Sequence, residues 1–244
     1  MAHRILVTAR RVLLQLGHDP RTVVTMLAVP SLLFTLLSWV YNATPQTFDI
    51  VGSTLLGIFP LNTMFLVASI TTLRERISGT LERLLALPMG KTDLLAGYAL
   101  AFGAVAVVQV SLVTALAVCV LGLDVAGPVW LLLVVALAAA LLGIALGLFV
   151  SAFARSEYQA LQFTPAVVLP QALICGLLVP RERMPWVLRT VADWLPISQT
   201  ADAMAEVRLH ADITRAFAHD IAFVAASAVL VILLGAATLR RRLA

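Results

Sequence analysis

Charge is scarce in this sequence. Only 12% of its 244 residues are charged, and 61% are hydrophobic, whereas soluble domains average about 25% charged and 45–50% apolar residues. This composition excludes an ordinary soluble enzyme and predicts an all-α polytopic membrane protein. A membrane-crossing helix needs about 20 residues, so roughly five to seven spans with short connections would use the whole length. We therefore expect no soluble catalytic domain.

Cysteine and catalytic motifs are also scarce. The two cysteines, Cys119 and Cys175, lie in separate apolar segments, where single thiols are expected to pack in the core. The sequence contains neither H-E-x-x-H nor G-x-S-x-G, which argues against a membrane metalloprotease or a hydrolase. The four histidines lack the spacing of metal ligands. We expect no catalytic residue, no metal and no cofactor bound by this chain.

One stretch matches only part of a phosphate-binding loop. Residues 89–92 read Met-Gly-Lys-Thr, like the end of G-x-x-x-x-G-K-[ST]. Leu85 occupies the position of the first glycine, and Pro88 lacks the N–H group that would face a phosphate. We therefore expect no nucleotide to bind there.

Ionisable side chains are missing from the interior of the predicted membrane spans. The six spans are residues 22–41, 50–73, 94–121, 129–153, 158–179 and 221–239. Ion-coupled transporters usually keep ionisable groups inside the membrane, so the energy for any transport would have to come from a partner. The spans do contain Gln109, Gln162 and Gln171, which could either bond helices together or line a substrate path.

Three further features organise the chain. Residues 1–16 have apolar side chains on one helical face and arginines on the other, which predicts an amphipathic helix lying in the membrane interface. Residues 180–220 mix apolar and charged side chains and predict short external or re-entrant helices before the last span. Gly143 and Gly147 have GxxxG spacing, which lets two helices approach closely, for example at a subunit interface.

The basic residues are unequally divided between the two sides of the predicted membrane. Twelve of the 17 lie on the side of the termini. The other five are Arg181, Arg183, Arg189, Arg208 and Arg215. Because cytoplasmic loops carry the excess of basic residues, we predict that both termini are cytoplasmic. The basic residues flank apolar segments and form no single stripe, which argues against nucleic acid as a partner.

The densest internal charge cluster is the stretch 74–88. Leu73 and Ile77 begin an apolar stripe that continues through Leu81, whereas Glu75 and Arg76 fall on the opposite side. This pattern predicts a short amphipathic cytoplasmic helix, and the alternative is a solvated loop that only fixes the topology. Gly79 would cost about 1 kcal/mol inside a helix and therefore indicates a bend or a close backbone contact.

The same stretch resembles a known family signature. From Glu75 to Met89 the sequence reads E-x-x-x-G-T-L-E-x-L-L-A-L-P-M, similar to the segment after the second span in ABC-2 type transporter permeases. The similarity extends to Asp19-Pro20-Arg21, a proline-rich fifth span, Met184-Pro185 and Leu195-Pro196. It is strongest with the bacterial drug-efflux branch, which includes permeases similar to those of daunorubicin resistance.

The resemblance implies a single transmembrane permease domain, residues 1–244, in a bacterial cytoplasmic (inner) membrane. It implies a homodimer or heterodimer that binds two copies of a separate ABC ATPase subunit, which would hold ATP and Mg²⁺. The residues implied to contact the ATPase are Arg74, Glu75, Arg76, Gly79, Thr80, Glu82 and Arg83.

The charge-free spans favour an amphiphilic or apolar substrate, such as a drug or a lipid-like molecule. The alternatives are a non-transporting assembly or sensor protein that recruits a different cytoplasmic partner, and a channel.

Overall fold

The computed structural model describes residues 2–79 and 91–241, which form helices joined by short turns and contain no strand. The elements are α1 (Ala2–Gly17), α2 (Pro20–Val40), α3 (Pro45–Ile77), α5 (Lys91–Ala115), the π-helical turn η1 (Leu116–Val120), α6 (Val129–Ser151), α7 (Glu157–Ile174), the 3₁₀ turn η2 (Arg181–Arg183), α8 (Trp186–Asp193), α9 (Pro196–Leu209) and α10 (Arg215–Arg241). The predicted all-α polytopic membrane fold is confirmed.

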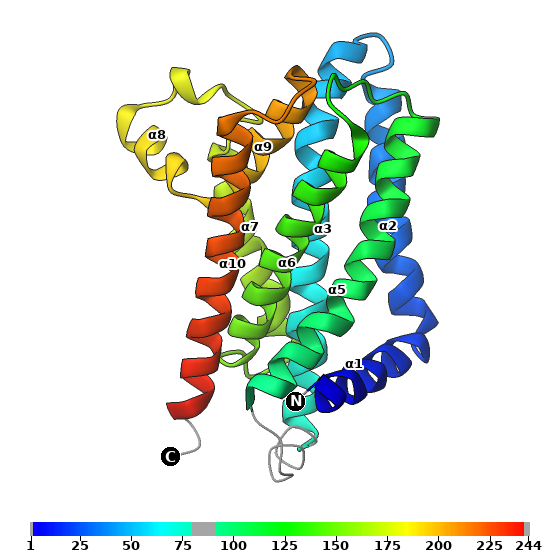
Figure 1. Cartoon of the computed structure of the whole chain (residues 1–244), viewed down its shortest axis with the longest axis vertical. Coiled ribbons are helices and arrows are strands. Elements are labelled where there is room, and N and C mark those ends of the chain that lie inside the picture. The colour runs from blue at the N-terminus through cyan, green and yellow to red at the C-terminus, as the bar shows by residue number, and fades with distance from the viewer. Residues whose placement is uncertain (1, 80–90, 242–244) are drawn as a thin grey trace.

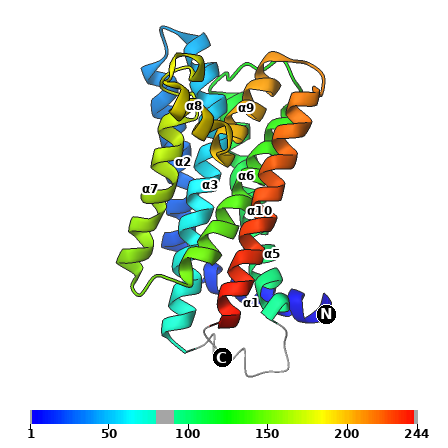
Figure 2. The same ribbon diagram turned by 90° about the vertical axis from the view of Figure 1, so that its left-hand side faces the viewer.

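Five helical segments of the described chain are long and apolar enough to cross a membrane. They are Pro20–Val40, Pro45–Ile77, Ala96–Val120, Val129–Ser151 and Arg215–Gly235. The predicted fifth span corresponds to α7, which has 18 residues, contains two prolines and is not among these five. It nevertheless runs beside α3 and along the bundle (Figure 2). The sixth span thus stays a prediction.

The boundary predicted between the second span and a separate helix at residue 74 is wrong. α3 continues through Ile77, and Ser78 and Gly79 close it with hydrogen bonds from their N–H groups to the carbonyls of Arg74 and Arg76. Gly79 has φ +71°, the left-handed conformation in which glycine commonly ends helices. The glycine therefore ends α3. Residues 80–88 of the predicted coupling helix lie outside the described residues.

α3 and α6 form the centre of the bundle. A Cβ atom added to Gly143 would lie 2.2 Å from the Leu61 carbonyl oxygen, and one added to Gly147 would lie 2.5 Å from the Phe65 carbonyl oxygen. The two glycines thus let α6 pack directly on the backbone of α3. The close approach that the GxxxG spacing predicts occurs within the chain and not at a subunit interface.

The two helices of the segment before the last span, α8 and α9, are buried to different degrees. α9 buries Ile197, Thr200 and Met204 and packs against α3 and α10. α8 lies at the edge of the bundle end that is predicted to be external, which we call the outer end (Figure 1). α8 exposes several large apolar side chains, among them Trp186, as expected of a membrane-surface helix. The sequence does not reveal this difference, because most of the residues that α9 buries are small or polar and add little to a hydrophobic pattern.

The last helix also begins earlier than the predicted residue 221. α10 starts at Arg215, so His219 and the buried Asp220 belong to a candidate membrane-crossing helix. The candidate spans therefore do contain charged residues and a histidine, which corrects the expectation of charge-free spans, although all of them lie near helix ends. They are Arg21 in α2, Asp49, Arg74, Glu75 and Arg76 in α3, and Arg215, His219 and Asp220 in α10.

Candidate functional site

The candidate site is the end of the bundle where the chain termini lie. α1 crosses this end, and the end of α3, the start of α5, the turn between α6 and α7 and the end of α10 lie beside it (Figure 1). This is the side predicted to be cytoplasmic. Of the residues implied to contact an ATPase, positions 74–79 belong to this end, whereas Thr80, Glu82 and Arg83 lie outside the described residues.

Glu75 joins three helices at this end. Arg11 Nη2 lies 3.0 Å from Glu75 Oε2 and 3.2 Å from the Tyr98 hydroxyl oxygen, and the Tyr98 hydroxyl donates a hydrogen bond to the same carboxylate oxygen. Glu75 is only 6% exposed and Tyr98 is fully buried. A buried carboxylate needs such partners, because leaving it uncompensated would be strongly destabilising. We call Arg11, Glu75 and Tyr98 the three-helix node.

The node corrects the predicted helical faces. The periodicity placed Glu75 on a solvent-exposed face that would contact a partner and Ile77 on an apolar stripe with Leu73. In the structure Glu75 is buried, Leu73 is fully buried and Ile77 is 60% exposed. Local periodicity cannot detect that α1, more than sixty residues earlier in the chain, covers this face of α3. Arg11 and Tyr98 were not singled out by sequence reasoning for the same reason.

Two arginines tie the end of α3 to the turn between α6 and α7. Arg74 forms a bidentate ion pair with Glu157, with N···O distances of 2.8 and 2.9 Å, and both side chains are about half exposed. Arg76 donates hydrogen bonds to the carbonyl oxygens of Ala152 and Ala154. The end of α3 is therefore held on two sides, by α1 and α5 through the node and by residues 152–157 through these arginines.

Close backbone packing fixes α1 on α5. A Cβ atom added to Gly97 would lie 2.6 Å from Thr8 Cβ and 3.2 Å from the Ile5 carbonyl oxygen. Ala9 and Val12 of α1 are buried in the same cluster as Tyr98. These contacts lock α1 in the position from which Arg11 reaches Glu75.

The three glutamines proposed for a substrate path do not meet. Gln109 is fully buried on α5, and its Nε2 donates to the Met26 carbonyl of α2 at 3.1 Å. Gln171 donates to the Val167 carbonyl within α7, and Gln162 is exposed on that helix. Gln109 thus bonds two helices, while the two α7 glutamines belong to another part of the bundle.

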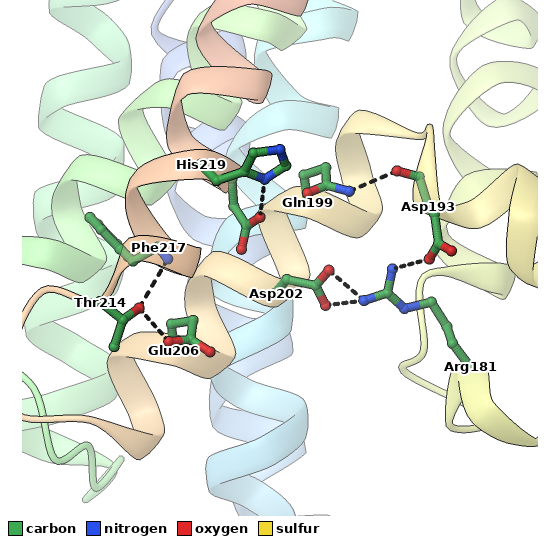
Figure 3. Close-up of polar contacts among 9 residues, drawn as sticks. Arg181, Asp193, Gln199, Asp202, Glu206, Thr214, Phe217 and His219 are labelled. Atoms are coloured by element: carbon green, nitrogen blue, oxygen red, sulfur yellow. Dashed lines mark hydrogen bonds and ion pairs between the residues drawn. The ribbon is translucent and has the colours of Figure 1, made fainter.

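The opposite end of the bundle carries a second polar cluster (Figure 3). Arg181, just after α7, lies between Asp193 at the end of α8, 3.1 Å away, and Asp202 of α9, to whose two carboxylate oxygens it donates hydrogen bonds. Burial raises the pKa of the Asp202 carboxyl, although the Arg181 guanidinium acts in the opposite direction. We call Arg181, Asp193 and Asp202 the outer clamp, because Arg181 holds α8 against α9.

The Arg181→Ala variant is expected to lower the stability of the outer end by about 1 to 3 kcal/mol, because it leaves the half-buried Asp202 carboxylate without its cation. Thermal unfolding of the purified protein in detergent measures this loss. Since the pKa of Asp202 is already raised and would rise further, the loss is greatest at neutral pH and shrinks on acidification as the carboxyl takes up a proton.

Arg183→Ala is the matched control, because Arg183 is an exposed arginine of the same turn with no ion pair among the described residues. Equal losses in the two variants, or a loss that does not change with pH, would contradict a clamp that depends on Asp202.

Comparison with known proteins gives one family and several curated relatives. The family model described as ABC-2 type transporter matches residues 3–208. ABC transporter G family member 20 of Dictyostelium discoideum is 25% identical over 143 residues, which are 59% of this chain and 20% of that protein. Probable multidrug ABC transporter permease YbhS of Escherichia coli (strain K12) is 26% identical over 179 residues, which are 73% of this chain and 48% of that protein. The matched parts thus span less than half the length of these relatives.

Proposed function

Because the chain belongs to the ABC-2 type transporter family, we propose that it is the membrane-spanning permease subunit of an ATP-driven exporter. In this proposal a separate ABC ATPase subunit, present in two copies, hydrolyses ATP-Mg, and a second permease copy completes a homodimer or heterodimer. Both termini face the cytoplasm of a bacterium. The proposed substrate is an amphiphilic or apolar molecule, which agrees with the name of the multidrug permease relative.

The three-helix node is the observation that carries this proposal. A permease without its own energy source must receive work at one end and convert it into helix movement. The described residues before and after the segment 80–90 are Gly79, four residues after Glu75, and Lys91, seven residues before Tyr98. A force that the ATPase applies to the segment 80–90 would therefore displace α3 together with α1, α5 and residues 152–157.

The distribution of ionisable residues also favours an external energy source. In the five candidate spans of the described chain, such residues occur only near helix ends, as in Arg21, Glu75 and Asp220. Proton- or ion-driven transporters usually keep ionisable groups near the middle of the membrane. Work supplied by a partner at the inner end fits this pattern better than an ion gradient.

Ile77 provides a direct test of ATPase docking. It is 60% exposed at the inner end of α3, and burying such a side chain in an interface contributes about 1.5 to 3 kcal/mol, so Ile77→Glu should weaken ATPase binding about tenfold or more. The measurement is the amount of ATPase subunit that co-purifies with the tagged permease. Glu82→Lys, at a position implied by the family resemblance, is expected to act in the same direction.

The matched control is Ile213→Glu, which changes the same residue type at 57% exposure in the turn between α9 and α10. This turn lies at the outer end (Figure 1). Membrane insertion should be unchanged in all variants. Undiminished ATPase binding by both Ile77→Glu and Glu82→Lys would overturn the docking site. Conductance of the chain reconstituted alone would favour a channel, and ATPase-independent recruitment of another cytoplasmic protein would favour an assembly or sensor role.

A further inference from the structure

A cleft of about 600 Å³ opens between the end of α1, the first half of α2 and the second half of α3. These elements can be followed in Figure 1. The volume lies within the range of about 300 to 1,000 Å³ that is typical of small-molecule sites. None of the three glutamines discussed above lines it, and neither the family match nor the curated relatives assign it a role.

The side chains that line the cleft change from charged to apolar along its length. Its inner end is lined by Asp19, Arg21, Arg74 and Glu75, and its middle by Val29, Leu66, Val67 and Ile70. Asn62 and Thr63 lie at the far end, about 18 Å from Arg74 along α3 at about 1.5 Å per residue. An elongated molecule with a polar head and an apolar tail matches this gradient.

Of the charged side chains at the mouth of the cleft, the one without a partner among the described residues is a cation. The Asp19 carboxylate accepts hydrogen bonds from the Thr22 N–H at 3.2 Å and the Thr22 hydroxyl at 2.6 Å. Glu75 is paired within the three-helix node, and Arg74 is paired with Glu157. Arg21 is exposed, and its guanidinium has no ion pair or hydrogen bond with the described residues. An anionic headgroup would supply the partner that Arg21 lacks.

The far end of the cleft offers an amide in apolar surroundings. Asn62 is half-buried, and its side chain makes no hydrogen bond to the part of the chain that the structure describes. The neighbouring Thr63 hydroxyl already donates to the Phe59 carbonyl at 2.9 Å. A polar group at membrane depth gains from a partner because no water competes there. Asn62 can thus bind a polar group carried on the tail of a ligand.

We propose that this cleft binds anionic single-chain amphiphiles that enter from the inner leaflet, with the headgroup at Arg21 and the chain lying along α3 towards Asn62. One unpartnered cation at the mouth and a volume of about 600 Å³ fit one chain better than a two-chain phospholipid. As a substrate site the cleft rests on the proposed export function, whereas the binding itself does not.

The test uses the full chain in nanodiscs of zwitterionic phosphatidylcholine, without ATPase. A palmitic acid that carries a photoactivatable diazirine in mid-chain is the probe, and mass spectrometry locates the labelled peptides. We expect labelling of α2 and α3 next to the cleft, displaced by unlabelled dodecyl phosphate. Arg21→Glu should reduce it at least fivefold. Leu66→Trp, which fills the middle of the cleft, should reduce it without changing the mouth.

Arg10→Glu is the matched control, because Arg10 is another exposed arginine at the inner end and does not line the cleft. Labelling that is equal in Arg21→Glu and Arg10→Glu would overturn the inference, as would equal labelling by the uncharged methyl ester. Stronger labelling by a diazirine phosphatidylglycerol that palmitic acid does not displace would identify a two-chain lipid site instead. Cross-links between the clefts of two copies would identify a dimer contact.

This experiment separates the inference from the proposed function. A chain that binds ATPase and exports an amphiphile but shows no cleft labelling overturns only the inference. A chain that labels in the cleft but neither binds an ATPase nor transports overturns only the proposed function.

Discussion

Glu75→Ala is expected to separate ATP hydrolysis from transport. The substitution leaves Arg11 without its carboxylate and removes the acceptor of the Tyr98 hydroxyl, so α1, α3 and α5 lose their shared polar contact. Because Arg11 is partly exposed and can regain water, we expect a loss of about 2 to 4 kcal/mol in unfolding free energy. Thermal unfolding measures this loss, and the ratio of transport to ATP hydrolysis in proteoliposomes measures the coupling.

Two further variants make this prediction specific. Glu157→Ala also removes a carboxylate paired with an arginine, but its ion pair with Arg74 is solvent-exposed and should contribute only about 0 to 1 kcal/mol. Glu75→Gln keeps an acceptor for Tyr98 and removes only the charge, so its coupling should be intermediate. Equal effects of Glu75→Ala and Glu157→Ala would contradict a special role of the node. Loss of ATPase binding in Glu75→Ala would indicate a docking residue instead.

Gly143→Ala is expected to disrupt the centre of the bundle. Its new methyl group would lie 2.2 Å from the Leu61 carbonyl oxygen, and backbone atoms of α3 cannot move aside as a side chain could. Overpacking of this kind costs about 1 to 3 kcal/mol and sometimes more. We expect a lower unfolding temperature and an aggregated fraction in size-exclusion chromatography, and a stronger effect for Gly143→Leu.

Gly103→Ala is the control for this prediction. Gly103 also lies in a membrane-crossing helix, but a Cβ there would be no closer than 3.8 Å to Leu141. Both substitutions gain helix propensity, by about 1 kcal/mol, so Gly103→Ala should be neutral or slightly stabilising. If both variants unfold like the unmodified protein, α6 does not pack on α3 as closely as the structure shows.

Helix boundaries with local signals could be predicted from the sequence. The start of α2 has such signals, because its N-cap residue Asp19 accepts a hydrogen bond from the Thr22 N–H and Pro20 occupies its first turn. Both signals act between neighbouring residues, so no tertiary contact can hide them. The boundary at residue 74 was misplaced because no local signal separates Leu73 from Arg74, and the chain stays helical until Gly79.

The sequence indicated which segment holds the candidate site, but not the contacts that its residues make. The charge cluster near residue 75 coincides with the end of α3 at which the three-helix node lies. The role of Glu75 could not be predicted, because the partners of a charge are set by residues distant in the chain, Arg11 and Tyr98. Asn62 was missed because a single amide in an apolar span gives no periodic signal, and its significance comes from the cleft beside it.

The sequence by itself determined the class of the protein, the positions of most membrane-crossing helices and the family signature, because hydrophobic runs, caps and motifs are properties of neighbouring residues. Only the tertiary structure decided the roles of Glu75, Gly143 and the residues that line the cleft. It buried Glu75 beneath α1, placed Gly143 against α3 of the same chain and opened a cleft between α2 and α3. Each of these depends on which surfaces meet when the helices pack, and packing is a property of pairs of segments that lie far apart in the chain.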